Sequence, residues 1–427
     1  MNKYKYDNID EVLYSGELRN GLRIRVVPKK DFNSFYAVLA VNYGGAQRRF
    51  RIGEELCDTP AGVAHYLEHK MFDLPDGDNA LSILTNNGAD PNAFTSADMT
   101  AYYFQCTDKF EENLRVLLHF VTTPYFTDET VEKERGIISQ EILMGEDNPG
   151  VIVYYNLLKM LYRNHPIRDR VAGTVESIAE ITAQTLYDCH KAFYCPANMV
   201  LCVEGDVDPE RIAQIAEEET TKGYSCAPKP DYGKKDRLTP TKKLQKALMP
   251  VSSPQFLIGL RFTPEEYGSA LLREDLVSAL TMRLLAGQSS PFYSRLYREG
   301  LLNRDFDYEV DFTAGTGTVI LGGESSDPER ILEEFQKELE RVSEEGFDAR
   351  AFELAKRAAV GSRLRSLEDF ENVCLAFATG VFTMPTSGIG TPAFSATSLT
   401  ILYRRGFSSS VMSLAWFALS AISLDFQ

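Results

Sequence analysis

The spacing of apolar residues predicts both strands and helices along this chain of 427 residues. Short runs of aliphatic and β-branched residues are typical of strands, whereas apolar residues that recur every three or four positions indicate helices with one buried face. In the first half, residues 21–27 and 36–41 fit the strand pattern. In the second half, we predict strands at 255–262 and within 308–321, with a helix at 272–285 between them.

A break in both periodicities separates the two halves. Residues 221–244 are rich in lysine, proline, glycine and aspartate, which interrupt helices and strands. Further on, Ser326-Asp327-Pro328 predicts the start of a helix with an apolar side formed by Ile331, Leu332, Phe335, Leu339 and Val342. Because the chain is too long for one ordinary core, we expect two domains, residues 1–225 and 246–427. The similar order of elements predicts the α+β class, with duplicated domains that each contain a mainly antiparallel sheet covered by helices.

Two of the five histidines stand one helical turn apart, in His65-Tyr66-Leu67-Glu68-His69. By chance, such a pair with an acid in the fourth position is expected roughly 0.007 times in a chain of this composition, so accident is a poor explanation. Thr59 is a candidate N-cap with Pro60 in the first helical position, and an apolar stripe follows at Ala61, Ala64, Leu67 and Met71. The segment therefore predicts a helix.

On such a helix, both imidazoles and the Glu68 carboxylate share one face, which suits a catalytic zinc ion. The alternative is a pair of surface histidines on an amphipathic helix. Residues 127–143 predict a second helix that Thr127 caps. Its Glu134 and Glu141 are nearly two turns apart, so they project from one side and could complete the site. Taken alone, these two glutamates would be ordinary solvated charges.

These motifs resemble those of the M16 zinc peptidases, the group of pitrilysin, insulin-degrading enzyme and the mitochondrial processing peptidase. The matching blocks span at least residues 20–210 and occur in the family's order. They are His65–His69, Asn92-Ala-Phe-Thr-Ser96, Glu134–Glu141, His165-Pro166, Gly173–Ile178, Tyr194–Met199 and Gly205-Asp206. Within the family, the chain looks similar to the short bacterial members, including the Bacillus-type proteins named for an association with elongation factor P modification.

The resemblance implies a zinc endopeptidase that hydrolyses peptides or small unfolded polypeptides. It implies one Zn²⁺ per chain, bound by His65, His69 and Glu141. Glu68 would then be the general base, and Glu134 a supporting acid. The second half has no His-x-x-Glu-His, so no further metal site is expected there.

Residues 92–106 predict two strands joined by a short turn. By resemblance, the first is an edge strand that binds extended peptide, which makes Asn92, Ala93 and Phe94 candidate substrate contacts. Without the neighbouring motifs, the same residues would be an ordinary core hairpin.

The second half departs from the family at the residues that contact the substrate backbone. Many M16 enzymes supply an arginine and, seven residues later, a tyrosine; here Arg298 matches the arginine, but position 305 is Asp and the nearest tyrosine is Tyr308. Either the loop is longer here or the chain lacks the pair, and we expect a second M16-like subunit, in a homodimer or heterodimer. The alternative function is a catalytically silent assembly or binding subunit.

The formal net charge of −16 argues against a nucleic-acid partner, since phosphate binding needs clustered basic residues. The N-terminus has no apolar secretion segment and 408–424 is too short and too serine-rich to span a membrane, so we expect a cytoplasmic protein with no membrane association. Seven cysteines in a long chain fit reduced thiols. From about residue 382 the tail is atypical for the family. Our hypothesis is that a reading-frame change or a divergent end replaced the usual C-terminus.

Overall fold

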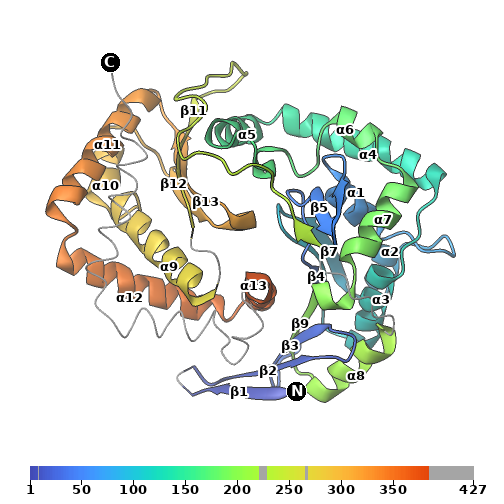
Figure 1. Ribbon diagram of the computed structural model, residues 1–427. Coiled ribbons are helices and arrows are strands. Elements are labelled where there is room, and N and C mark those ends of the chain that lie inside the picture. Colours follow the sequence, from blue (N-terminus) through green and yellow to red (C-terminus); the bar gives the residue numbers. More distant parts are fainter. Residues whose placement is uncertain (8, 221–227, 265–267, 384–427) are drawn as a thin grey trace. The chain divides into compact units, whose positions relative to one another are not determined.

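The computed structural model describes residues 1–7, 9–220, 228–264 and 268–383 (Figure 1). Two compact units are interleaved along the chain and are described here one at a time. The first unit contains residues 1–143, 169–233 and the stretch from 366 to the end of the described chain. The second contains 144–168 and 234–365. The expected domains, 1–225 and 246–427, stay a prediction.

The main sheet of the first unit runs in the order β1-β2-β3-β9-β4-β8-β7. Only β3 and β9 pair in parallel within it; the other neighbours in the described sheet are antiparallel. Residues 21–27 and 36–41, predicted as strands, form β3 and β4, and β7 lies at the edge of the described sheet. The strands are β1 (Asn2–Tyr6), β2 (Glu11–Glu17), β3 (Arg23–Pro28), β9 (Met199–Gly205), β4 (Phe35–Val41), β8 (Thr100–Cys106) and β7 (Asp90–Thr95).

Helices cover both faces of this sheet. One face packs against helices that surround the largest hydrophobic cluster, and the other is covered by α13 (Phe370–Thr383). A small separate sheet has the order β10-β5-β6, in which Lys229 and Pro230, from the predicted break, pair as a strand. The remaining elements are α1 (Val63–Lys70), α2 (Ala80–Asn86), α3 (Phe110–Thr122), α4 (Asp128–Glu146), α6 (Val175–Ala179), α7 (Ala183–Phe193), α8 (Pro209–Glu219), η2 (Pro196–Asn198), β5 (Arg49–Ile52), β6 (Glu55–Asp58) and β10 (Lys229–Pro230).

The second unit is built on an antiparallel sheet in the order β11-β13-β12. The predicted strand 255–262 is β11, and the predicted helix after Pro328 is α11, which Asp327 caps through the backbone N–H of Arg330 at 3.1 Å. The elements are α5 (Pro149–Leu161), η1 (Pro166–Arg168), β11 (Gln255–Phe262), α9 (Gly268–Leu285), α10 (Pro291–Arg298), β12 (Asp307–Asp311), η3 (Thr313–Gly315), β13 (Gly317–Glu324), α11 (Pro328–Glu345) and α12 (Ala349–Ser366).

Both units combine mainly antiparallel sheets with covering helices, which confirms the α+β class. The tail was predicted to be atypical from about residue 382, and all of it from residue 384 on lies outside the described residues. Within the described ranges, no helix combines the length and the apolar character needed to cross a membrane.

Candidate metal centre

Helix α1 carries His65, Glu68 and His69, as predicted, but begins differently. Gly62 caps it with φ of 96°, and a Cβ there would lie 2.6 Å from the carbonyl oxygen of Ala172. Only glycine suits both the left-handed backbone and this close approach. The predicted Thr59 cap is wrong, because the Thr59 hydroxyl donates to the Arg48 carbonyl at 2.7 Å instead.

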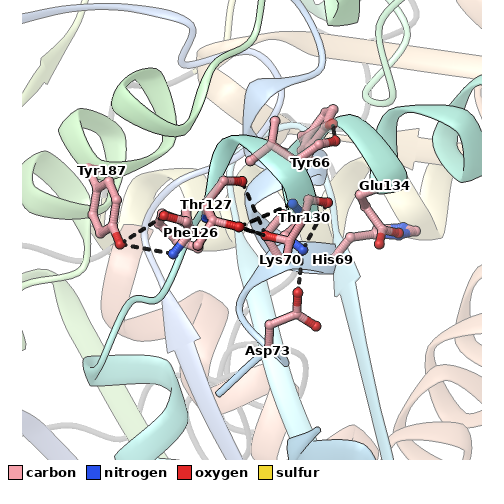
Figure 2. A network of polar contacts seen from close by, with 10 residues as sticks. Tyr66, His69, Lys70, Asp73, Phe126, Thr127, Thr130, Glu134 and Tyr187 are labelled. Atoms are coloured by element: carbon pink, nitrogen blue, oxygen red, sulfur yellow. Dashed lines mark hydrogen bonds and ion pairs between the residues drawn. The ribbon is translucent and has the colours of Figure 1, made fainter. Parts of the chain in front are cut away.

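Polar contacts hold α4 against α1 (Figure 2). The Tyr66 hydroxyl donates to the carbonyl of Val131, and the buried Lys70 ammonium donates to the carbonyl of Thr130 at 3.3 Å and pairs with Asp73. Thr127 caps α4 as predicted, since the Thr130 backbone N–H donates to its hydroxyl at 3.2 Å. Tyr66 and Lys70, each next to a histidine in α1, therefore hold the first turn of α4 in place.

This packing brings the two glutamates of α4 to the two histidines of α1. Nε2 of His65 lies 3.4 Å from Oε1 of Glu141, and Nε2 of His69 lies 3.6 Å from Oε2 of Glu141. On the other side of its ring, His69 meets Oε1 of Glu134 through Nδ1 at 3.0 Å (Figure 2). The imidazole centroids are 4.6 Å apart. His65, His69 and Glu141 thus converge, while Glu134 contacts the outer nitrogen of His69.

The convergent group fits a zinc ion. One donor atom from each of His65, His69 and Glu141 lies within 4.8 Å of the others. Zinc bonds to imidazole nitrogen and carboxylate oxygen are about 2.0–2.2 Å, which puts tetrahedral ligands about 3.3–3.6 Å apart, close to the observed separations. The Glu141 side chain is 49% exposed, so the group opens toward solvent. Two imidazoles and one carboxylate, with access for water, are a common donor set for catalytic zinc.

Negative charge is concentrated around the histidines. Burial lowers the pKa of His69, but the hydrogen bond to Glu134 and the charges of Glu68, Glu134 and Glu141 together raise it above its ordinary value. The hydrogen bond to His69 lowers the pKa of Glu134, and contact with His65 lowers that of Glu141. Both glutamates are therefore ionised at neutral pH, which favours a cation between them and the imidazoles.

Glu68 lies on the same helix and is 8% exposed. Its Oε2 accepts a hydrogen bond from the Thr95 hydroxyl at 2.7 Å. Thr95 is not among the site residues predicted from the sequence. The alternation of side chains along a strand was an available signal, because it puts Thr95 on the face of the sheet opposite to Phe94.

The predicted hairpin of residues 92–106 is confirmed as β7 and β8. Asn92 is exposed, Ala93 packs toward the larger core, and Phe94 lies on the other face, where its ring meets Tyr103 at a centroid distance of 6.3 Å. Their contacts with substrate stay a prediction.

Arg298 belongs to the second unit, where it ends α10. It is exposed, and its Nε donates to the Ser294 carbonyl at 3.0 Å. Tyr308, in β12, packs against the core of that unit. Whether Arg298 contacts substrate stays a prediction.

Comparison with known proteins identifies the chain's relatives. Residues 56–175 match the profile described as insulinase (peptidase family M16), and 180–359 match the peptidase M16 inactive domain. The uncharacterized zinc protease YmfH of Bacillus subtilis (strain 168) is 39% identical over 383 residues, which is 88% of this chain and 89% of that protein.

Solved structures give the same result. A crystal structure from Alicyclobacillus acidocaldarius, described as an M16-like peptidase, has a TM-score of 0.88 and 33% identity, and the match covers 95% of this chain and 94% of that one. Pitrilysin shares the fold, with a TM-score of 0.71 and 16% identity over 97% of this chain and 44% of its own. Together with the relatives named zinc proteases, these matches confirm the resemblance seen in the motifs: the chain belongs to peptidase family M16.

Proposed function

We propose that this protein is a zinc-dependent endopeptidase that hydrolyses peptides or small unfolded polypeptides. The convergence of His65, His69 and Glu141 supports this proposal most directly, because their donor atoms lie within 4.8 Å of one another, close enough to bind one metal ion together. Membership of the family, with curated relatives named zinc proteases, points the same way.

In this proposal, His65, His69 and Glu141 hold one zinc ion per chain. When bound, zinc polarises the scissile carbonyl and lowers the pKa of its water to about 7. Glu68 takes a proton from the attacking water and later delivers it to the leaving amine. Glu134 orients the His69 ring by accepting a hydrogen bond from Nδ1, which leaves Nε2 for the metal.

The experiment combines metal analysis with cleavage of a quenched fluorescent peptide by the full chain. Glu68→Gln keeps the shape of the side chain and all three proposed ligands but cannot take a proton. We expect it to retain zinc and to lose about 10²–10⁴-fold in kcat. Glu129→Gln is the matched control, because Glu129 is exposed on the first turn of α4. Normal turnover by Glu68→Gln would refute the assignment of the base.

A second M16-like subunit and a cytoplasmic location belong to the proposal as well. The substitution of Asp for Tyr at position 305 supports the need for a partner that supplies backbone contacts to substrate. The alternative function, a catalytically silent assembly subunit, is favoured by the same substitution. Zinc binding without cleavage, both alone and with the co-expressed product of a neighbouring gene, would favour the silent subunit.

A further inference from the structure

Thr95 reaches the buried carboxylate of Glu68 from the edge strand β7. Its hydroxyl donates to Oε2 at 2.7 Å, and Glu68 is almost inaccessible to solvent. A hydrogen bond to an ionised carboxylate is stronger than one between neutral groups, and it is stronger still where water competes little. This bond therefore restricts the Glu68 side chain, which also belongs to the rigid helix α1.

Thr100 holds Thr95 in turn. The two residues are direct partners in the register of β7 and β8, and their hydroxyl oxygens are 3.3 Å apart. Thr100 is fully buried, and its hydroxyl donates to the Tyr43 carbonyl at 2.8 Å. That bond uses the only hydroxyl proton of Thr100, and the proton of Thr95 goes to the Glu68 carboxylate, which can only accept. Thr100 therefore supports Thr95 through the backbone pairing of β7 with β8 and through side-chain contact across the pair.

We propose that Thr95 is a positioning residue for Glu68: its hydroxyl, supported by Thr100, holds Oε2 so that Oε1 is presented for proton transfer. The inference rests on the proposed function, since it concerns the base of the same site. It also connects the base to β7, the strand at the edge of the described sheet, so distortion of that edge would move the Glu68 carboxylate.

Three variants test this role in the full-length protein loaded with zinc. Thr95→Val keeps the branched shape without the hydroxyl, and Thr95→Ser keeps the hydroxyl. Ser96→Ala is the matched control, because Ser96 accepts a bond from the backbone N–H of Met99 at 3.1 Å in the same hairpin and makes no contact with Glu68 among the described interactions. For Thr95→Val we expect kcat for a quenched peptide to fall about ten- to a hundredfold, with KM and zinc content within twofold. Thr95→Ser and Ser96→Ala should stay within about threefold of the wild type.

Crystal structures of the metal-free variants give a readout that does not depend on turnover. We expect the Glu68 carboxylate to be displaced in Thr95→Val and to stay in place in Thr95→Ser. If Thr95→Val does not fold, Thr95→Ala is compared with Thr95→Ser in the same two measurements.

The positioning role is overturned if Thr95→Val retains kcat within twofold, if serine fails to restore it, or if Ser96→Ala causes the same loss. These outcomes differ from failure of the proposed function, in which the wild type itself has no zinc-dependent cleavage. In that case the position of Glu68 in the metal-free crystals decides: an undisplaced carboxylate in Thr95→Val overturns the role.

Discussion

Replacement of Glu134 by glutamine tests how far the carboxylate beside His69 determines zinc affinity. Oε1 of Glu134 lies 3.0 Å from Nδ1 of His69, and both side chains are mostly buried. Glutamine keeps the size of the side chain, and its amide oxygen can still accept from Nδ1. The substitution therefore removes the charge and leaves the hydrogen bond.

The expected loss follows from the difference between charged and neutral hydrogen bonds. A bond to a charged group contributes about 1.5–3 kcal/mol and a neutral one about 0.5–1.5 kcal/mol, so the difference is about 1–1.5 kcal/mol. This corresponds to roughly tenfold weaker zinc binding. Glu134→Ala also leaves the Nδ1 proton of His69 without its acceptor, and we expect a loss nearer to a hundredfold, as for other carboxylates that support metal-bound histidines.

Zinc affinity is measured by competition with a chromophoric chelator at constant pH and ionic strength. Glu129→Gln removes the same charge from the exposed first turn of α4 and should bind zinc as the wild type does. The reasoning would be refuted by a Glu134→Gln protein with zinc affinity within twofold of wild type. An equal loss in Glu129→Gln would also refute it, since it would trace the effect to overall charge.

Three further predictions concern stability. Glu204 is fully buried, with Lys29 at 3.4 Å, and burial outweighs that charge and raises the Glu204 pKa from 4.5 to about 8. The contribution of Glu204 to stability should therefore be complete below pH 4.5 and fall by about 3 kcal/mol by pH 7, measured as the difference between the wild type and Glu204→Gln. In urea titrations the pH slope of Glu204→Gln should differ from that of the wild type by this amount, and identical slopes would contradict the assignment. His190 is buried, and its Nε2–H donates to the Val121 carbonyl at 3.1 Å. Burial lowers the His190 pKa from 6.5 to about 4, so the contribution of His190 to stability should fall by about 3 kcal/mol as the pH drops from 6.5 to 4, opposite in sign to that of Glu204. The pH slope of His190→Gln between pH 4 and 6.5 should differ from that of the wild type by this amount, and identical slopes would count against the assignment. Tyr66→Phe removes the hydroxyl contact between α1 and α4 and should cost about 1 kcal/mol in thermal or urea unfolding, whereas a neutral result would show that the contact contributes little.

The helices of the site could be predicted from sequence because their signals are local. The 127–143 prediction matches α4, whose cap Thr127 and buried residues Val131, Ile138 and Ile142 lie within the segment itself. The pentad 65–69 fixes its own geometry, since helical spacing alone puts both imidazoles on one face. The approach of α4 to α1 was expected only by analogy, because it depends on contacts such as Tyr66 with Val131, which are distant in sequence.

Long-range contacts explain what the sequence did not reveal. Thr59 has the right chemistry for a cap, but the Arg48 carbonyl takes its proton. Gly62 stands before the helix with a left-handed backbone, and Ala172, more than a hundred positions away, leaves no space for a side chain there. Thr95 would be an unremarked strand residue without the fold that brings Glu68 to it. In each of these cases the structure depends on a residue that is distant in sequence, which no local sequence pattern identifies.

Helix α13 has a consequence for dissecting this protein into fragments. Cys374 and Ala378 of α13 are buried over β4 and β9, against residues such as Val38 and Cys202. A polypeptide that stopped at residue 233 would carry every proposed zinc ligand and yet leave this apolar surface bare, a cause of self-association in water. The N-terminal half is thus no autonomous module, and its production in soluble form would require complementation in trans by a peptide spanning residues 366–383.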